Sequence, residues 1–384
     1  MSLTAVATRT VAAIIMTCAV ALVPSAALAA PGGHAGAGPP VPASFRANSV
    51  TWVSAQRGWV LGAAQCGTKT CSDVIGTSDG GKTWQLIGTV KAPLANIGKG
   101  SQGITEVRFA TPAVGWIFGI GKFLFQTANG GRSWVRRPVP GAGTQVLGLA
   151  ASAAQTYAIT SDCVLGKALC HKPLSFWRIA TKPGSTWTRI PLNLPRNFTA
   201  GVSVLGKTVY VVDSQLEFGR PDKLYASTDG VHFAARPAPC DHSADIALIQ
   251  AVPMSAARVA LLCDGNPGFS KAVKTVYVSA DTGKTDVYAG LLGQFGIQAQ
   301  LAASPSGNLA VASWSDGSFI YVNDTHKKSW TMVEGISDGG AGWNDISYVS
   351  STRAWVVYAP ADSSGMGQLW TTRDGGQHWS PVTL

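Results

Sequence analysis

Residues Thr77–Trp84 read Thr-Ser-Asp-Gly-Gly-Lys-Thr-Trp, and this stretch decides the fold because the chain repeats it. We call the underlying pattern, Ser/Thr-x-Asp-x-Gly-x-Thr-Trp, the box. Six further copies, two close, two degenerate and two weak, lie at Thr127–Trp134, Thr372–Trp379, Ser227–Phe233, Ser279–Asp286, Pro183–Trp187 and Thr325–Trp330.

The spacing of the boxes is the second part of the signal. The last positions of successive copies are 44 to 53 residues apart. A repeat of that period with four short strands per unit is typical of β-propeller blades. In the unit of the second copy, β-branched or aromatic runs at 104–109, 115–119, 123–127 and 134–137 are bounded by Gly or Pro. The sequence therefore predicts an all-β chain, a seven-bladed β-propeller of four-stranded antiparallel blades over residues 46–384.

Each box residue has a mechanical explanation as part of a hairpin between the third and fourth strands of a blade. Asp tolerates turns and accepts backbone N–H groups, Gly adopts positive φ without steric cost, and Trp covers the turn with a large apolar face. We therefore predict structural, non-catalytic roles for Asp79, Trp84, Asn129, Trp134, Trp187, Asp229, Asp281, Trp330, Asp374 and Trp379.

The N-terminal region has the features of a signal peptide. Arg9 precedes the apolar run Val11–Val23, and Ala27–Ala29 is a small-x-small cleavage site. We expect residues 1–29 to be removed, a Gly/Pro/Ala-rich linker over 30–45, and no membrane span in the mature chain, because the apolar run is short. The predicted location is extracellular, with association to the cell wall left open.

Removal of the signal peptide would take Cys18 with it and leave six cysteines. Export makes these six candidates for disulfides. Six cysteines allow fifteen pairings, but proximity in sequence favours bonds within single blades. Metal binding is the rival interpretation, yet only His171 stands beside a cysteine and the spacing fits no zinc pattern. We expect no metal, no cofactor and the pairs Cys66–Cys71, Cys163–Cys170 and Cys240–Cys263.

The charge balance is basic but sparse. The formal net charge is +10, or +9 without Arg9, although only 13% of residues are charged. A positive exported protein can attract acidic glycans or anionic cell-envelope polymers, and a solvated surface without a partner is the alternative. Arg136, Arg137, Arg189 and Arg196 are the candidate residues for such a ligand. No nucleic-acid recognition motif occurs, so we expect no nucleic-acid partner.

The boxes, together with the Gly58-Trp59 strand, resemble the exported Asp-box propellers of the bacterial neuraminidase repeat superfamily. Within it, the chain looks most like the photosystem II stability/assembly-factor-like group, which combines a Gly-Trp second strand with a box such as Thr77–Trp84. The resemblance covers about residues 46–384. It implies the fold but no single activity, because sialidases, xyloglucan-cleaving glycosidases, sortilin-type receptors and assembly factors share such boxes.

A sialidase-type glycoside hydrolase acting on an acidic glycan is the enzyme alternative. That family needs an arginine triad, a Tyr–Glu nucleophile pair, an Asp acid/base and a Phe/Tyr-Arg-Ile-Pro start. Here Phe45–Asn48 lacks the Ile-Pro, Glu217 is the one glutamate placed for such a pair, and no arginine triad stands out. Most aspartates outside the boxes look like turn residues beside Gly or Ser. We therefore predict no catalytic residues.

Two tryptophans outside the boxes are the aromatic binding candidates. Trp314 precedes the turn Ser315–Gly317, and Trp343 follows the glycine-rich residues 338–342. Exposed Trp at a propeller mouth would suit sugar stacking or protein contact, whereas packing between blades is the alternative. The prediction as a whole is a monomeric, secreted, non-enzymatic propeller that acts as a binding or assembly scaffold for a protein or glycan partner.

Overall fold

The computed structural model describes most of the chain from Gly38 to the C-terminus. The described residues are 38–96, 99–141, 143–163, 170–182, 184–196, 200–214, 222–241, 246–268, 271–324, 328–361 and 365–384.

Seven four-stranded sheets account for all the named strands. Blade one consists of β1 (Arg46–Trp52), β2 (Gly58–Cys66), β3 (Lys69–Thr77) and β4 (Gln85–Val90). Blade two consists of β5 (Gly103–Phe109), β6 (Gly115–Ile120), β7 (Leu124–Thr127) and β8 (Val135–Arg136). Blade three consists of β9 (Gln145–Ala151), β10 (Gln155–Ser161), β11 (Ser175–Ala180) and β12 (Thr188–Ile190). Blade four consists of β13 (Ala200–Leu205), β14 (Thr208–Asp213), β15 (Lys223–Ser227) and β16 (Ala234–Arg236).

The second half of the chain continues the same pattern. Blade five consists of β17 (Ile246–Pro253), β18 (Val259–Gly268), β19 (Lys271–Ser279) and β20 (Val287–Leu291). Blade six consists of β21 (Gln298–Ala303), β22 (Leu309–Trp314), β23 (Ser318–Asp324) and β24 (Ser329–Ile336). Blade seven consists of β25 (Trp343–Tyr348), β26 (Ala354–Tyr358), β27 (Gln368–Thr372) and β28 (Ser380–Pro381).

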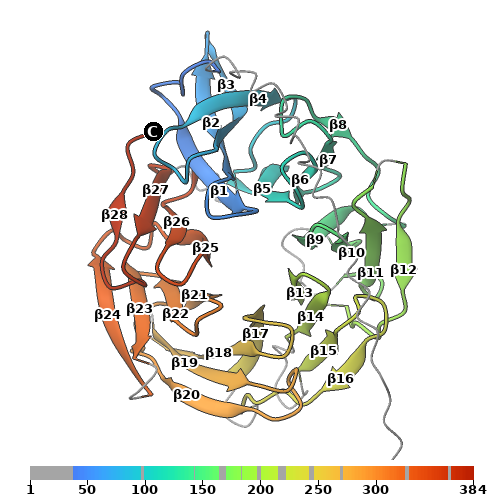
Figure 1. The fold of residues 1–384 in the computed structure, drawn as a ribbon, viewed down its shortest axis with the longest axis vertical. Coiled ribbons are helices and arrows are strands. Elements are labelled where there is room, and N and C mark those ends of the chain that lie inside the picture. The colour runs from blue at the N-terminus through green and yellow to red at the C-terminus, as the bar shows by residue number, and fades with distance from the viewer. Residues whose placement is uncertain are drawn as a thin grey trace, which may run out of the picture. The chain divides into compact units, whose positions relative to one another are not determined.

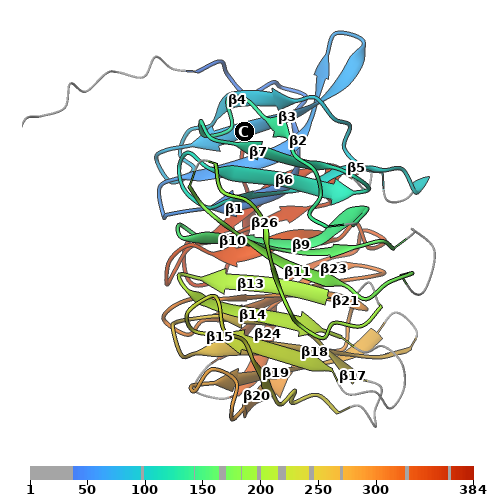
Figure 2. The same ribbon diagram turned by 90° about the vertical axis from the view of Figure 1, so that its right-hand side faces the viewer.

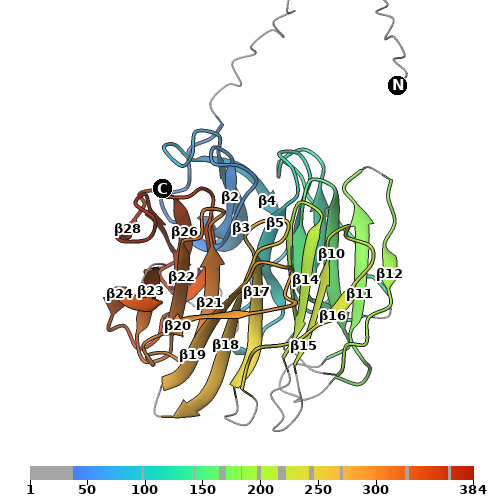
Figure 3. The same cartoon turned by 60° about the horizontal axis from the view of Figure 1, so that its bottom comes forward.

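The blades form a ring, and the first strand of each blade lies nearest its axis (Figure 1). Within every blade the strands pair antiparallel with their neighbours in sequence. Figures 2 and 3 show the same ring from the side and tilted, with neighbouring blades packed against one another. The seven-bladed all-β architecture predicted from the box spacing is confirmed. In the described part of the chain, no helix has the length and apolar character needed to cross a membrane.

The hydrophobic core is divided among the interfaces between blades. The described residues form seven buried clusters, and each cluster combines side chains from two neighbouring blades. Val60 and Ile75 of blade one, for example, share a cluster with Val357 and Leu369 of blade seven. Strands in such a ring are covered on both faces, which explains their runs of apolar residues.

The boxes form hydrogen-bonded turns between the third and fourth strands. Asp79 Oδ1 accepts the backbone N–H groups of Lys82 at 2.9 Å and Thr83 at 3.0 Å, and Oδ2 accepts the Thr83 hydroxyl at 2.6 Å. Thr77 Oγ1 accepts the N–H of Gly81 at 2.9 Å, and Gly81 has a φ of +79°. Equivalent side-chain acceptors are Asn129, Asp229, Asp281 and Asp374. Residues 325–327 of the weak copy before Trp330 lie outside the described residues.

Aromatic side chains on the second strands tie two of the boxes to the preceding blade by hydrogen bonds. Trp59 of blade one donates its indole N–H to the carbonyl oxygen of Gly130, in the box of blade two, at 3.0 Å. Tyr157 of blade three makes the same kind of contact with Gly230, in the box of blade four, at 3.0 Å. The box thus contributes to the interface between blades as well as to its own hairpin.

The ring closes between blades seven and one without exchanging a strand. Trp355 of blade seven stacks on Trp52 with ring centroids 4.7 Å apart and meets Trp84 edge-on at 6.0 Å. A Cβ atom on Gly81 would lie 2.4 Å from the Trp355 ring, so the box of blade one needs glycine there. Side-chain packing thus contributes to a seam that other propellers can close with a shared strand, and the Ala47 N–H adds a backbone hydrogen bond to the Gly367 carbonyl oxygen.

Part of the segment assigned to the linker belongs to the propeller instead. Leu86 donates its backbone N–H to the carbonyl oxygen of Pro39 at 2.9 Å, and Gly38 donates to the Gln85 side chain at 3.0 Å. Phe45 packs against the cluster between blades seven and one. Composition alone missed this contact, because an outer strand can bind an extended Gly/Pro segment through backbone groups.

The three disulfides have the predicted pairing. Their Cα atoms are 5.9 Å apart for Cys66–Cys71, 4.0 Å for Cys163–Cys170 and 5.6 Å for Cys240–Cys263. Each bond joins residues of one blade or of the loop that enters it. Three disulfides fit an extracellular or otherwise oxidising compartment.

Candidate binding site at the channel mouth

Two hollows occupy the ring axis, one toward each face. Strands alternate in direction, so the box turns lie at the end of the ring where the innermost strands finish. The hollow at that end, the box-side hollow, has a volume of about 770 Å³. The hollow at the opposite end, the mouth hollow, has a volume of about 840 Å³ and is lined where the innermost strands begin.

Charged side chains are rare on the strands that surround the axis. The seven innermost strands carry Arg46, Glu106, Arg108 and Asp345 and otherwise only uncharged residues. Glu106 lines both hollows, while Arg108 and Asp345 line the box-side hollow. Any electrostatic selectivity of the axis therefore depends on these few groups.

Arg108 joins two carboxylates that are far apart in sequence. Its Nη2 atom lies 2.6 Å from Asp345 Oδ1, and its Nη1 atom lies 3.1 Å from Asp345 Oδ2. Nη2 also lies 2.6 Å from Glu106 Oε2. Burial opposes the charge on Arg108, but the two carboxylates outweigh burial and raise the pKa of the guanidinium above its ordinary value.

Asp345 is held from a third blade as well. Its Oδ2 atom accepts the Ser49 hydroxyl at 2.5 Å and the Val50 backbone N–H at 3.0 Å. The residue sits at an irregularity in the pairing of β25 with β26 and has a φ of +57°. This local backbone conformation turns the carboxylate toward blades one and two.

The mouth hollow combines an apolar wall with amide groups. Trp314 and Ile297 contribute apolar surface, and Gln298, Gln300 and Asn344 contribute side-chain amides. Such a mixture of a few polar groups on a mainly apolar concave surface is typical of binding sites.

The glycine-rich residues 338–342 build one side of this hollow. Asp338 accepts the Gly340 N–H at 2.8 Å and the Tyr358 hydroxyl at 2.7 Å. Burial would raise the pKa of Asp338, but hydrogen bonds from Ser318, Tyr358 and the loop backbone outweigh it and lower the pKa. A Cβ atom on Gly340, which has a φ of +86°, would lie 1.4 Å from the Ser315 carbonyl oxygen, so this close approach requires glycine.

A buried ion pair in blade five supports the part of the hollow where the chain enters blade six. Lys274 is 0% exposed, and its ammonium donates to the carbonyl oxygens of Gly296 at 2.6 Å and Phe295 at 3.4 Å. Ile297, the next residue, lines the hollow. Asp264 Oδ1 lies 4.0 Å from the Lys274 nitrogen. Burial raises the pKa of Asp264 to about 7 although Lys274 lowers it, and burial lowers the pKa of Lys274 although Asp264 raises it.

The two candidate tryptophans have different surroundings. Trp314 lies at the end of β22, is partly exposed and lines the mouth hollow. Trp343 is only 1% exposed and packs against Tyr358 and Trp370, with ring centroids 4.9 Å and 5.8 Å away. Trp343 thus belongs to the cluster between blades six and seven and also borders the mouth hollow, so its role in binding stays a prediction.

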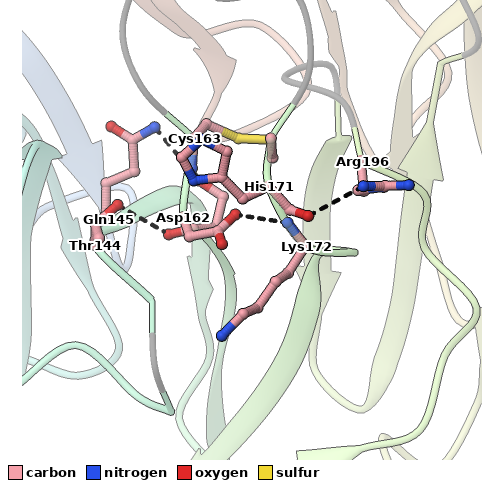
Figure 4. The surroundings of a disulfide bond; sticks show 9 residues. Thr144, Gln145, Asp162, Cys163, His171, Lys172 and Arg196 are labelled. Atoms are coloured by element: carbon pink, nitrogen blue, oxygen red, sulfur yellow. Dashed lines mark hydrogen bonds between the residues drawn. A yellow bond between two sulfur atoms is a disulfide. The ribbon is translucent and has the colours of Figure 1, made fainter.

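The four candidate arginines are not gathered at the axis. Arg136 and Arg189 lie on the outer strands β8 and β12, and Arg137 directly follows β8. Arg196 follows β12 and donates to the His171 carbonyl oxygen at 3.1 Å, beside the disulfide of blade three (Figure 4). Any anion bound by these residues would lie on the periphery of blades two and three.

Sequence reasoning did not select Glu106, Arg108 or Lys274. One available signal was the position of Glu106 and Arg108 two residues apart on a predicted first strand, which places both side chains on one face. Lys274 offered no comparable signal, because it occupies one position of an ordinary apolar and polar alternation in β19. Glu217, the residue considered for a sialidase-type pair, lies outside the described residues.

The comparisons with known proteins support the fold. No family model and no curated protein matches the chain. Among solved structures, YCF48 bound to D1 peptide is similar with a TM-score of 0.55 and 15% identity over 87% of this chain and 95% of that chain. Oligogalacturonate lyase from Vibrio parahaemolyticus has a TM-score of 0.55 and 10% identity over 82% and 86%. Sqt1 from Saccharomyces cerevisiae has a TM-score of 0.52 and 8% identity over 88% and 86%.

Proposed function

We propose that this chain is an exported, non-enzymatic propeller that binds a segment of another protein in the mouth hollow. The observation that carries the proposal is the hollow itself, which has a volume of about 840 Å³ and is lined by apolar side chains and amide groups at the centre of the ring. An extended segment entering there could pair its backbone with the side chains of Gln298, Gln300 and Asn344 while an apolar side chain contacts Trp314.

Two further findings support this proposal. YCF48, one of the similar structures, is described as bound to a peptide, so a propeller of this shape can serve as a peptide receptor. The predicted signal peptide and the three disulfides are consistent with export. Export and the nature of the partner remain part of the proposal.

The hydrolase alternative has less support from the axis. Glycoside hydrolysis needs two carboxylates facing a sugar. On the innermost strands the carboxylates are Glu106 and Asp345, and both are hydrogen-bonded to Arg108. Each of these two carboxylates is therefore engaged in an ion pair with Arg108, which gives the hydrolase alternative less support than peptide binding.

To test the proposal, a bulky side chain is introduced into the mouth hollow and peptide capture is measured. A library of displayed heptapeptides would be panned against the purified protein, against Ala341→Trp and against Ala234→Trp. Ala341 lines the hollow, whereas Ala234 is exposed on the outer strand β16 and receives the same substitution as a control. We expect enriched peptides with the wild type and the control only. Equal enrichment with Ala341→Trp would refute binding at this site.

A further inference from the structure

The mouth hollow carries a charge opposite to that of the whole protein. Its described lining includes the carboxylates of Glu106 and Asp338 but no lysine, arginine or histidine. The chain as a whole has a formal net charge of +10. A concave surface lined by one sign of charge concentrates the field and favours a ligand group of the opposite sign. The local field at this site therefore favours cations.

Glu106 remains negatively charged in this setting despite its contact with Arg108. Asp345 binds Arg108 through both carboxylate oxygens, at 2.6 Å and 3.1 Å, and its side chain is 8% exposed. The positive charge of Arg108 is thus offset by the more buried partner. Glu106 contacts Arg108 through Oε2, is 30% exposed, and gives the three-residue group a net charge of −1.

Trp314 provides an aromatic face in the same hollow. An ammonium or guanidinium group is attracted to the face of an indole ring, and most strongly where the cation is partly removed from water. Gly342 packs against one edge of the Trp314 side chain, since a Cβ atom there would lie 3.0 Å from Cδ1. Carboxylates and an aromatic ring on one concave surface are the groups that recognise a basic side chain.

We propose that the mouth hollow receives a lysine or arginine side chain of the bound segment and that Glu106 determines this preference. This inference rests on the proposed function, because it names the chemistry of the segment that the hollow binds. Asp338 and Trp314 contribute a second carboxylate and the aromatic contact. An acidic segment would meet two carboxylates without a compensating cation from the described lining.

The first experiment reads the composition of the captured peptides. The heptapeptide library would be panned against the wild type, Glu106→Gln and Glu334→Gln. Glu334 lies on β24, the outer strand of blade six, so its variant loses the same charge away from the axis. We expect enrichment of Lys or Arg at one position of the peptides with the wild type and with Glu334→Gln, and loss of that enrichment with Glu106→Gln.

The second experiment measures affinity by calorimetry with one enriched peptide and a copy in which norleucine replaces its basic residue. We expect the wild type to bind the norleucine peptide at least tenfold more weakly, and Glu106→Gln to bind both peptides about equally. Asp338→Asn provides an independent variant should Glu106→Gln unfold, and it should reduce the tenfold difference. The thermal melting temperature of each variant shows whether it is folded.

The outcomes separate the two proposals. Peptides that are captured in the hollow without a basic preference, or with a preference that survives in both Glu106→Gln and Asp338→Asn, overturn this inference and leave peptide binding intact. Failure of the wild type to enrich any peptide overturns the proposed function and this inference together.

Discussion

Replacement of Lys274 by methionine tests the energetics of blade five and the support of the mouth hollow together. The side chain is fully buried, and its ammonium donates to the carbonyl oxygens of Ala272, Phe295 and Gly296 at 3.1, 3.4 and 2.6 Å. Asp264 lies opposite on β18, and its Oδ1 atom has no hydrogen-bond partner among the described residues. Methionine keeps the length of the side chain but removes both the charge and the donors.

The expected loss in the free energy of unfolding comes from the groups that lose the Lys274 ammonium as a partner. Removing one partner of a buried ion pair costs about 3–5 kcal/mol, because the remaining carboxylate must either stay buried without compensation or take up a proton. The carbonyl oxygens add to this cost to the extent that water cannot reach them. We therefore expect Lys274→Met to lower the free energy of unfolding by about 3–5 kcal/mol at pH 8, where Asp264 is ionised.

Urea denaturation followed by tryptophan fluorescence measures this loss, with reversibility checked by dilution. The control is the double variant Lys274→Met/Asp264→Leu, which removes both charges. Replacing a whole buried pair by apolar residues is often neutral, so the double variant should recover most of the stability that the single variant loses. A loss below about 1 kcal/mol in Lys274→Met, or a double variant no more stable than the single one, would refute the reasoning.

Three further outcomes are expected. The raised pKa of Asp264 means that its contribution to stability falls as pH rises from about 4 to its folded value of about 7, so Asp264→Asn should flatten the pH profile of urea unfolding in that window. The pKa of Asp79 is lowered to about 2 because bonds from Thr83, Thr77 and Lys82 outweigh burial, so its contribution is present above pH 4 and lost as pH falls toward 2. Asp79→Ala should lower the melting temperature but leave peptide capture unchanged, and capture lost without destabilisation would make the box a binding site. Heparin binding by the outer arginines should weaken with added salt, because exposed charges are screened over about 10 Å at 0.1 M. It should also weaken in the double variant Arg136→Gln/Arg137→Gln, which removes two of these charges. Binding that does not respond to salt would exclude this surface.

The fold could be predicted because its determinants are local. The hydrogen bonds of the first box join residues that are four apart in sequence, Thr83 to Asp79 and Gly81 to Thr77. Each box can therefore be recognised from its own residues, and seven boxes at a regular spacing predict a ring of seven blades. The disulfides were predictable for the same reason, since the longest spans 23 residues.

The site could not be predicted in the same way, because its members are distant in sequence and their orientation depends on the assembled ring. Arg108 and Asp345 are 237 residues apart. Trp314 and Trp343 both stand beside a turn and both line the mouth hollow, yet Trp314 is partly exposed and Trp343 is buried. The difference comes from the side chains that the folded chain packs against each ring, and Trp343 lies against Tyr358 and Trp370.

In the cluster of Arg108, Asp345 and Glu106 at the axis, Asp345 has a structural role and we assign a binding role to Glu106. Asp345 of blade seven contacts Ser49 of blade one and Arg108 of blade two, so one carboxylate links the last blade to the first two at the place where the ring closes. This linkage uses the whole of the Asp345 carboxylate and offsets the charge of Arg108. Glu106 adds a second carboxylate to the same guanidinium from the strand that carries Arg108. Unlike Asp345, Glu106 also lines the mouth hollow, in which we place the basic side chain of a partner.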